Sequence, residues 1–105
     1  MRASPNDRRQ REAANQALFR EINNKLRELH PPESEHVGNF LCECGAGGCM
    51  TTISMPLTAY AEIRSHPLRF ITLAGHHHPA VERVVEDHGG WTVVELYGEA
   101  AGQLT

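Results

Sequence analysis

Residues 42–49 read Cys42-Glu43-Cys44-Gly45-Ala46-Gly47-Gly48-Cys49, which places three cysteines within eight residues in a CxCx4C pattern. Thiolates are soft anionic ligands suited to zinc, and a glycine-rich connection lets the backbone turn tightly enough to bring three sulfurs to about 2.3 Å from one ion. A chain of 105 residues buries a limited core, so a metal is a useful supplement to its stability. We therefore expect a zinc-binding loop here.

A tetrahedral ion needs a fourth ligand, and the histidines after Gly75 are the obvious supply. Adjacent side chains of an extended chain diverge, so only one or two of His76, His77 and His78 can reach the same ion. His76 follows a glycine that can place it at a turn, which favours it, although spacing alone leaves its two neighbours open. The alternative is that the cysteines are small buried hydrophobes and the histidines a solvated cluster. A thiolate-rich site also accepts copper, iron or an iron–sulfur cluster in place of zinc.

A long N-terminal helix is predicted over residues 5–29. Its apolar residues follow one another at steps of four, four and three, which stacks them on one face: Leu18, Ile22, Leu26 and Leu29. Pro31 and Pro32 cannot continue the helix, which should stop at His30. We expect the apolar face to cover either the sheet or the same helix of a second copy. Self-association through this helix is therefore one expected partnership, beside an unknown protein partner.

The remaining chain predicts short strands and one short helix. Residues 33–38 read as a polar linker, residues 51–55 and 69–73 as strands, and Pro56 as the first residue of a helix that presents Leu57, Tyr60 and Ile63 on one face. Residues 81–86 and 91–97 are β-branched runs separated by Asp87-His88-Gly89-Gly90, which is typical of a hairpin.

The predicted fold class is α+β: a long N-terminal helix, a small, largely antiparallel sheet with a C-terminal β-hairpin, one short helix and the zinc-binding loop. We expect a single domain over residues 1–105, with the helix at 1–30, a metal-binding core at 39–98 and a frayed tail at 99–105.

The charge balance and the cysteine count narrow the class of protein. Ten Lys and Arg residues against thirteen Asp and Glu give a net charge of −3, which makes nucleic-acid binding unlikely. No apolar run approaches the length of a membrane span, and the first residues lack the apolar stretch of a signal peptide. We therefore expect no membrane contact and a cytoplasmic location. In that reducing compartment three cysteines favour a metal over disulfides.

Several short motifs resemble a group of small, uncharacterised proteins of high-GC Gram-positive bacteria. The family pattern contains an N-terminal FREVN helix, then FLCECGDPDC, EY..VR..P.RF, PGHE and VERVVE...YLVVE. This chain has Phe19-Arg20-Glu21-Ile22-Asn23, Phe40-Leu41-Cys42-Glu43-Cys44-Gly45, Tyr60 with Ile63-Arg64, Pro67 with Arg69-Phe70, Gly75-His76, and Val81-Glu82-Arg83-Val84-Val85-Glu86 with Val93-Val94-Glu95.

The resemblance covers most of the chain and implies His76 as the fourth ligand beside Cys42, Cys44 and Cys49. It implies no activity. This chain departs from the pattern where Ala46-Gly47-Gly48 replaces Asp-Pro-Asp, where Pro56 replaces a helix-capping Thr, and where His77 replaces Glu. The loop thus lacks two acids near the expected metal.

The sequence is compatible with three functions. A closed zinc site would stabilise a small structural or regulatory interaction module, since three thiolates leave the ion a poor Lewis acid. A small metalloenzyme would instead use Glu43, His77 or His78 as acid–base groups beside an exchangeable ligand position. A thiol-based redox or metal sensor would eject its ion when a cysteine is oxidised.

Overall fold

The computed structural model describes residues 5–29, 36–46 and 49–98. These residues form α1 (Pro5–Glu28), β1 (Val37–Leu41), β2 (Thr52–Pro56), α2 (Leu57–Arg64), β3 (Arg69–Leu73), β4 (Glu82–Asp87) and β5 (Trp91–Leu96). Strands β1 and β2 make one antiparallel sheet, and the other strands make a second antiparallel sheet in the order β3-β5-β4. The predicted α+β class is confirmed, with the strands divided between two small sheets.

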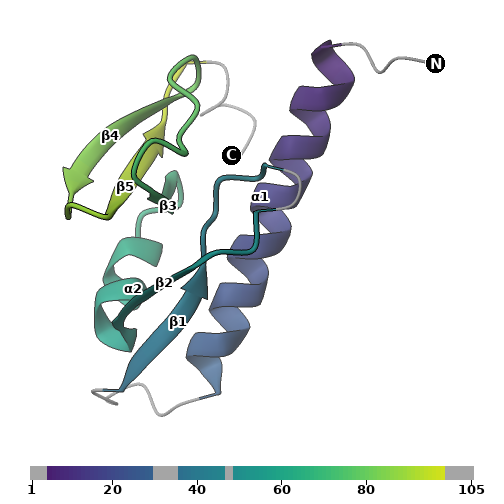
Figure 1. Cartoon of the computed structure of the whole chain (residues 1–105). Helices are drawn as coiled ribbons and strands as arrows, with labels where there is room; N and C mark the ends of the chain where they lie inside the picture. Colours follow the sequence, from purple (N-terminus) through teal and green to yellow (C-terminus); the bar gives the residue numbers. More distant parts are fainter. Residues whose placement is uncertain (1–4, 30–35, 47–48, 99–105) are drawn as a thin grey trace.

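Helix α1 spans nearly the predicted range and lies along one side of the molecule, with β1 beside its C-terminal half (Figure 1). The helix is rotated about its own axis in a way that the sequence did not predict, because the leucine face was expected to cover a sheet. Leu18 and Leu29 are 51% and 77% exposed. Among the described side chains of α1, the buried ones are Gln16 and Asn23. The sheet alternative for the leucine face was therefore wrong for these two residues. Among the described residues, neither helix is long and apolar enough to cross a lipid bilayer.

Strand β1 begins inside the segment expected to be a polar linker. Val37 pairs with Pro56 and Gly38 with Met55, so the linker prediction was wrong for residues 37–38. Residues 33–35 lie outside the described part of the chain. Gly38 is required by packing, because a Cβ at this position would lie 2.9 Å from Cε2 of Phe40 and 3.0 Å from Cδ2 of Leu57. The strand thus depends on contacts distant in sequence, which a local pattern does not show.

The main core lies between the two sheets and α2. The three predicted apolar residues of α2, Leu57, Tyr60 and Ile63, are all buried. The rings of Phe40 and Tyr60 stack with centroids 4.2 Å apart and an interplanar angle of 11°. The same cluster of buried residues contains Cys42 and Cys44. The cysteine loop is therefore built into the core.

The C-terminal hairpin is confirmed as β4 and β5, which pair in antiparallel register. The turn between them contains Gly89 at a φ of 85°, a conformation that glycine adopts without steric cost. A β-bulge interrupts the ladder between Val84 and Glu86, and β4 is one of the two edge strands of its sheet. The predicted tail at 99–105 lies outside the described residues.

Candidate metal centre

Cys42, Cys44, Cys49 and His76 come together at one point of the fold. Each offers one ligand atom, and these four atoms all lie within 4.8 Å of one another. His76 Nδ1 lies 3.8 Å from Cys42 Sγ and 3.7 Å from Cys49 Sγ. In a tetrahedral zinc site, bonds of about 2.3 Å to sulfur and 2.1 Å to nitrogen separate these two ligand types by about 3.6 Å. The four residues could therefore hold one metal ion with little rearrangement.

Backbone hydrogen bonds hold the cysteine loop between its neighbours. The Cys42 N–H donates to Thr51 O at 2.9 Å, and the Glu43 N–H donates to Ile71 O on β3 at 2.7 Å. The Leu73 N–H donates to Cys42 Sγ at 3.2 Å, which stabilises negative charge on that sulfur. The loop thus runs along β3, which ends close to His76.

His76 reaches the cluster because β3 ends in a tight turn. Gly75 has a φ of 82°, which an L-residue adopts only with strain, and the His76 N–H donates to Leu73 O at 3.0 Å. The sequence-based expectation that a glycine would place His76 at a turn is confirmed by this geometry.

The ligand set is asymmetric in its exposure. Cys42 and Cys44 are 0% and 1% exposed, Cys49 is half-buried and His76 is exposed. Burial raises the pKa of Cys42 to about 12 and also raises the pKa of Cys44. Burial acts in the same direction on Cys49, but hydrogen bonds, led by one from the backbone of Thr51, outweigh it and lower the Cys49 pKa. A bound cation would supply the positive charge that the two buried thiolates lack.

Three polar side chains of α1, Asn15, Gln16 and Asn23, hydrogen-bond the backbone around the cysteines, and we call them the polar latch. Asn23 brackets Leu41, donating to its carbonyl at 2.9 Å and accepting from its N–H at 2.8 Å. Gln16 Nε2 donates to Glu43 O at 3.1 Å, and Asn15 Nδ2 donates to Gly45 O at 3.4 Å. The latch thereby satisfies backbone groups of the loop that would otherwise be buried without partners.

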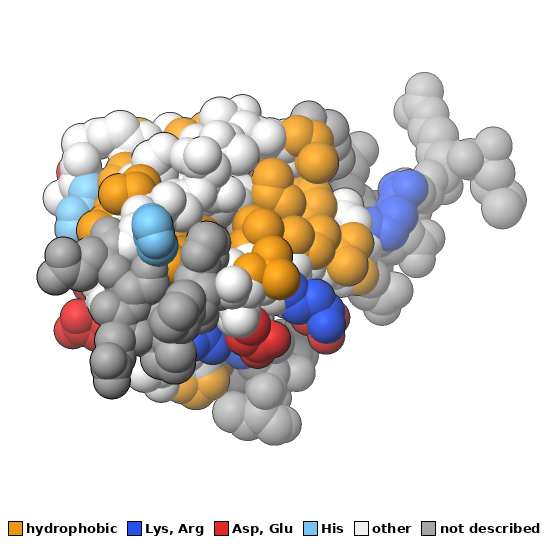
Figure 2. All heavy atoms as spheres, turned by 90° about the horizontal axis from the view of Figure 1, so that it is seen from below, with side chains coloured by type: hydrophobic (Ala, Val, Ile, Leu, Met, Phe, Trp, Pro, Cys, Tyr) orange, Lys and Arg blue, Asp and Glu red, His pale blue; other side chains and the backbone are white. Residues whose placement is uncertain are grey.

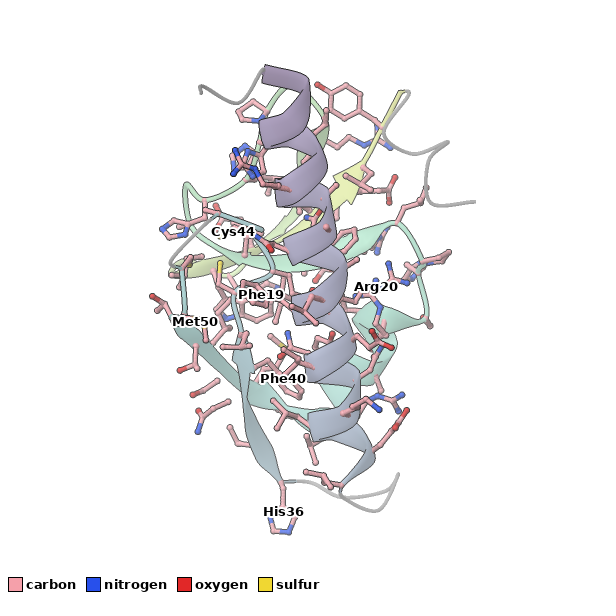
Figure 3. The ribbon with its side chains drawn as sticks, turned by 90° about the vertical axis from the view of Figure 1, so that its right-hand side faces the viewer. Phe19, Arg20, His36, Phe40, Cys44 and Met50 are labelled. Atoms are coloured by element: carbon pink, nitrogen blue, oxygen red, sulfur yellow. The ribbon has the colours of Figure 1, made fainter. Side chains whose placement is uncertain are left out.

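Figure 3 looks onto α1 and shows Phe19 on the side of the helix nearer to Cys44, with Arg20 on the opposite side. Arg20 ties that opposite side to the second sheet, donating to Pro67 O at 2.9 Å and lying 5.2 Å above the ring of Phe70 on β3. The sequence analysis did not predict the polar latch, because it judged the buried face of α1 from the spacing of the leucines alone. The available signal was the pair of amide side chains at positions 16 and 23, two turns apart on one face.

Glu43 points away from the sulfurs and into the core. Its side chain is fully buried, and Oε2 accepts hydrogen bonds from Tyr60 at 2.6 Å and from Asn23 at 2.9 Å. Oε1 accepts from the Ile71 N–H at 2.9 Å and lies 3.7 Å from Arg64 Nη1. Burial raises the pKa of Glu43, against the opposing effect of these donors. Its position gives no support to an acid–base role, because a substrate in solvent does not reach it.

The two neighbouring histidines lie beside the cluster without joining it. His78 Nε2 lies 2.8 Å from Cys44 O and donates to it, since a carbonyl only accepts. The His78 backbone N–H donates to Glu82 Oε1 at 2.8 Å, and Glu82 Oε2 accepts from Gln16 at 2.7 Å. His77 is half-buried, and its Nδ1 has no hydrogen-bond partner among the described residues. Of the three histidines, His76 is the one grouped with the thiols.

Comparison with protein-family models, with curated proteins and with solved structures gave no match. The described residues provide three thiols and one imidazole, grouped closely enough to hold a metal ion.

Proposed function

We propose that this chain is a small zinc-binding protein in which Cys42, Cys44, Cys49 and His76 form a closed structural site. The observation that carries the proposal is the grouping of all four ligand atoms within 4.8 Å. Three sulfurs and one imidazole are a common closed set for structural zinc, and strong donation from three thiolates leaves the ion a poor Lewis acid. Copper and iron are the alternative metals for the same ligands.

The bound zinc would fix the platform on which α1 docks. The loop is hydrogen-bonded to β3 through Glu43 and to α1 through the polar latch. Ligation by Cys42 and Cys44 would hold the loop in the shape that both contacts need, so the free energy of metal binding would contribute to folding. The product is a metal-stabilised module that presents α1 in one orientation, which suits an interaction or regulatory role.

The test is to compare His76→Ala with His77→Ala and His78→Ala. Losing one of four ligands forces the ion to recruit water, which should cost more zinc affinity than the roughly 10- to 100-fold of a change at a supporting residue. We expect His76→Ala to lose most of its zinc, His78→Ala to lose affinity moderately because it holds the Cys44 carbonyl, and His77→Ala to retain it. Elemental analysis and competition with a chromophoric chelator measure all three. Equal losses across the series would contradict the assignment of His76.

Redox-triggered release of the metal is a second candidate function, favoured by the exposure of one side of the site. Cys49 is the most accessible of the three thiols, and the Cys44 sulfur lies within 4.8 Å of it. Hydrogen peroxide would convert the Cys49 thiolate to a sulfenic acid and hydroxide. The Cys44 thiolate would then displace hydroxide to form a disulfide, and the ion would lose two ligands.

This candidate predicts that one equivalent of peroxide per site releases zinc, and that a thiol reductant restores binding. A chromophoric chelator follows the release, and mass spectrometry identifies the disulfide. Cys49 should be the first sulfur to be oxidised, because the remaining thiols are buried. Zinc retained through a large excess of peroxide would leave the closed structural site as the sole function of the cluster.

A further inference from the structure

Helix α1 carries a row of large apolar residues on a side that the described residues leave partly uncovered. Leu18, Leu26 and Leu29 are 51%, 36% and 77% exposed, and Ile22 is half-buried. We call these four residues the leucine row. The polar latch fixes this rotation, since Asn23 and Gln16 must face the cysteine loop. Single exposed apolar side chains are normal at a protein surface. A row of them along three helical turns is unusual and marks a site of interaction.

Strand β1 adds a further exposed apolar side chain. Figure 2 views the molecule from the end where α1 ends and β1 begins in Figure 1, and it shows hydrophobic side chains gathered in one area next to basic and acidic side chains. Val37, the first residue of β1, is 63% exposed. The leucine row therefore offers apolar surface whose burial against a partner would be favourable.

The charges beside the leucine row match a second copy of the same helix running in the opposite direction. The exposed charged residues of α1 whose side chains are described are Arg11, Glu21, Lys25 and Glu28, two of each sign. Glu21 and Lys25 stand two residues to either side of Asn23. In an antiparallel pair whose two-fold axis passes at Asn23, Glu21 of each copy faces Lys25 of the other.

The apolar residues fit the same antiparallel arrangement with the axis one residue away, at Ile22. That axis sets Leu18 of one copy beside Leu26 of the other and brings the two Ile22 residues together, and the axis at Asn23 leaves these side chains within about 3 Å of that pairing along the helix. A parallel pair would instead place Glu21 against Glu21 and Lys25 against Lys25, which is repulsive. In a symmetric interface each favourable contact away from the two-fold axis occurs twice. We propose that the leucine row is the interface of an antiparallel homodimer formed by α1, whether or not the cysteine cluster holds zinc.

The test is the oligomeric state of the full chain, measured by sedimentation and light scattering over a wide concentration range. We expect the mass of a dimer, and we expect Leu18→Glu to give a folded monomer with the circular dichroism of the unmodified chain, because Leu18 is already exposed. Val84→Glu on β4, where the side chain is 41% exposed, is the matched control and should stay dimeric.

The charge pairs allow a sharper test of the geometry. Glu21→Lys and Lys25→Glu should each raise the dissociation constant by roughly tenfold, because two attractive contacts become repulsive. The double variant with both exchanges should restore dimerisation. A monomer at every concentration would overturn the proposal, as would a dimer unaffected by Leu18→Glu or a double variant no better than the single ones. Zinc content measured on the same samples shows whether the metal site is intact, so a failure of dimerisation can be told apart from a failure of the metal site.

Discussion

Replacing Cys44 with serine is expected to remove most of the zinc and to leave the protein largely unfolded at room temperature. Cys44 is 1% exposed and belongs to the main core, so its loss removes a ligand from the buried side of the site. Structural zinc contributes roughly 10–16 kcal/mol of apparent binding free energy, whereas whole domains are stable by only about 5–15 kcal/mol. Elemental analysis and thermal melting followed by circular dichroism measure the two effects.

The control for this variant is the unmodified protein after removal of metal with a chelator. If the variant acts through the metal, the two samples should melt alike, and added zinc should rescue only the unmodified chain. A Cys44→Ser protein that keeps a full equivalent of zinc and melts unchanged would refute the proposed site.

The second large effect is expected at Glu43, the residue between the first two cysteines. Glu43→Leu leaves Tyr60, Asn23 and the Ile71 N–H without their acceptor and leaves Arg64 without its buried partner charge. Breaking a buried ionic network from one side typically costs about 3–5 kcal/mol. Urea unfolding at a fixed zinc concentration should show this loss as a lower transition midpoint.

Two further variants separate the buried network from a general effect of removing an acid. Glu43→Gln keeps one oxygen acceptor and should lose less stability than Glu43→Leu. Glu62→Leu removes an exposed carboxylate of α2 and should change stability by no more than about 0.5 kcal/mol. The Glu43 variants should also weaken zinc binding, because the carboxylate anchors the backbone that joins Cys42 to Cys44. A Glu43→Leu protein as stable as the Glu62→Leu protein would contradict the structural role.

Much of the fold follows from local sequence patterns. The proline pair after position 30, the apolar spacing in α2 and the glycine turn of the hairpin each act through neighbouring residues, and the predicted elements were confirmed. The grouping of Cys42, Cys44 and Cys49 was equally accessible, since the spacing of the cysteines and the small residues between them are local features.

Hydrophobic periodicity did not predict how α1 is rotated about its axis or which way Glu43 points. Both depend on which backbone groups need a side-chain hydrogen-bond partner. Hydrophobic periodicity assumes that a helix buries its leucines. In this chain, carbonyls at the cysteine loop accept hydrogen bonds from Gln16 and Asn23, so α1 turns these amide side chains inward instead. Alternation along an extended chain did contain a clue, because a residue between two cysteines that face one ion must itself face the other way. The strand β1 depended in the same way on its distant partner β2.

The bulge in β4 makes the β4 edge of the three-stranded sheet a poor template for a further strand. An open edge with a regular row of free amide and carbonyl groups invites pairing with other chains and growth into insoluble fibrils. Here the bulge between Val84 and Glu86 breaks that row, and the exposed charges of Arg83, Glu86 and Asp87 accompany it. Concentrated solutions of the protein should therefore resist fibrillar aggregation from this edge.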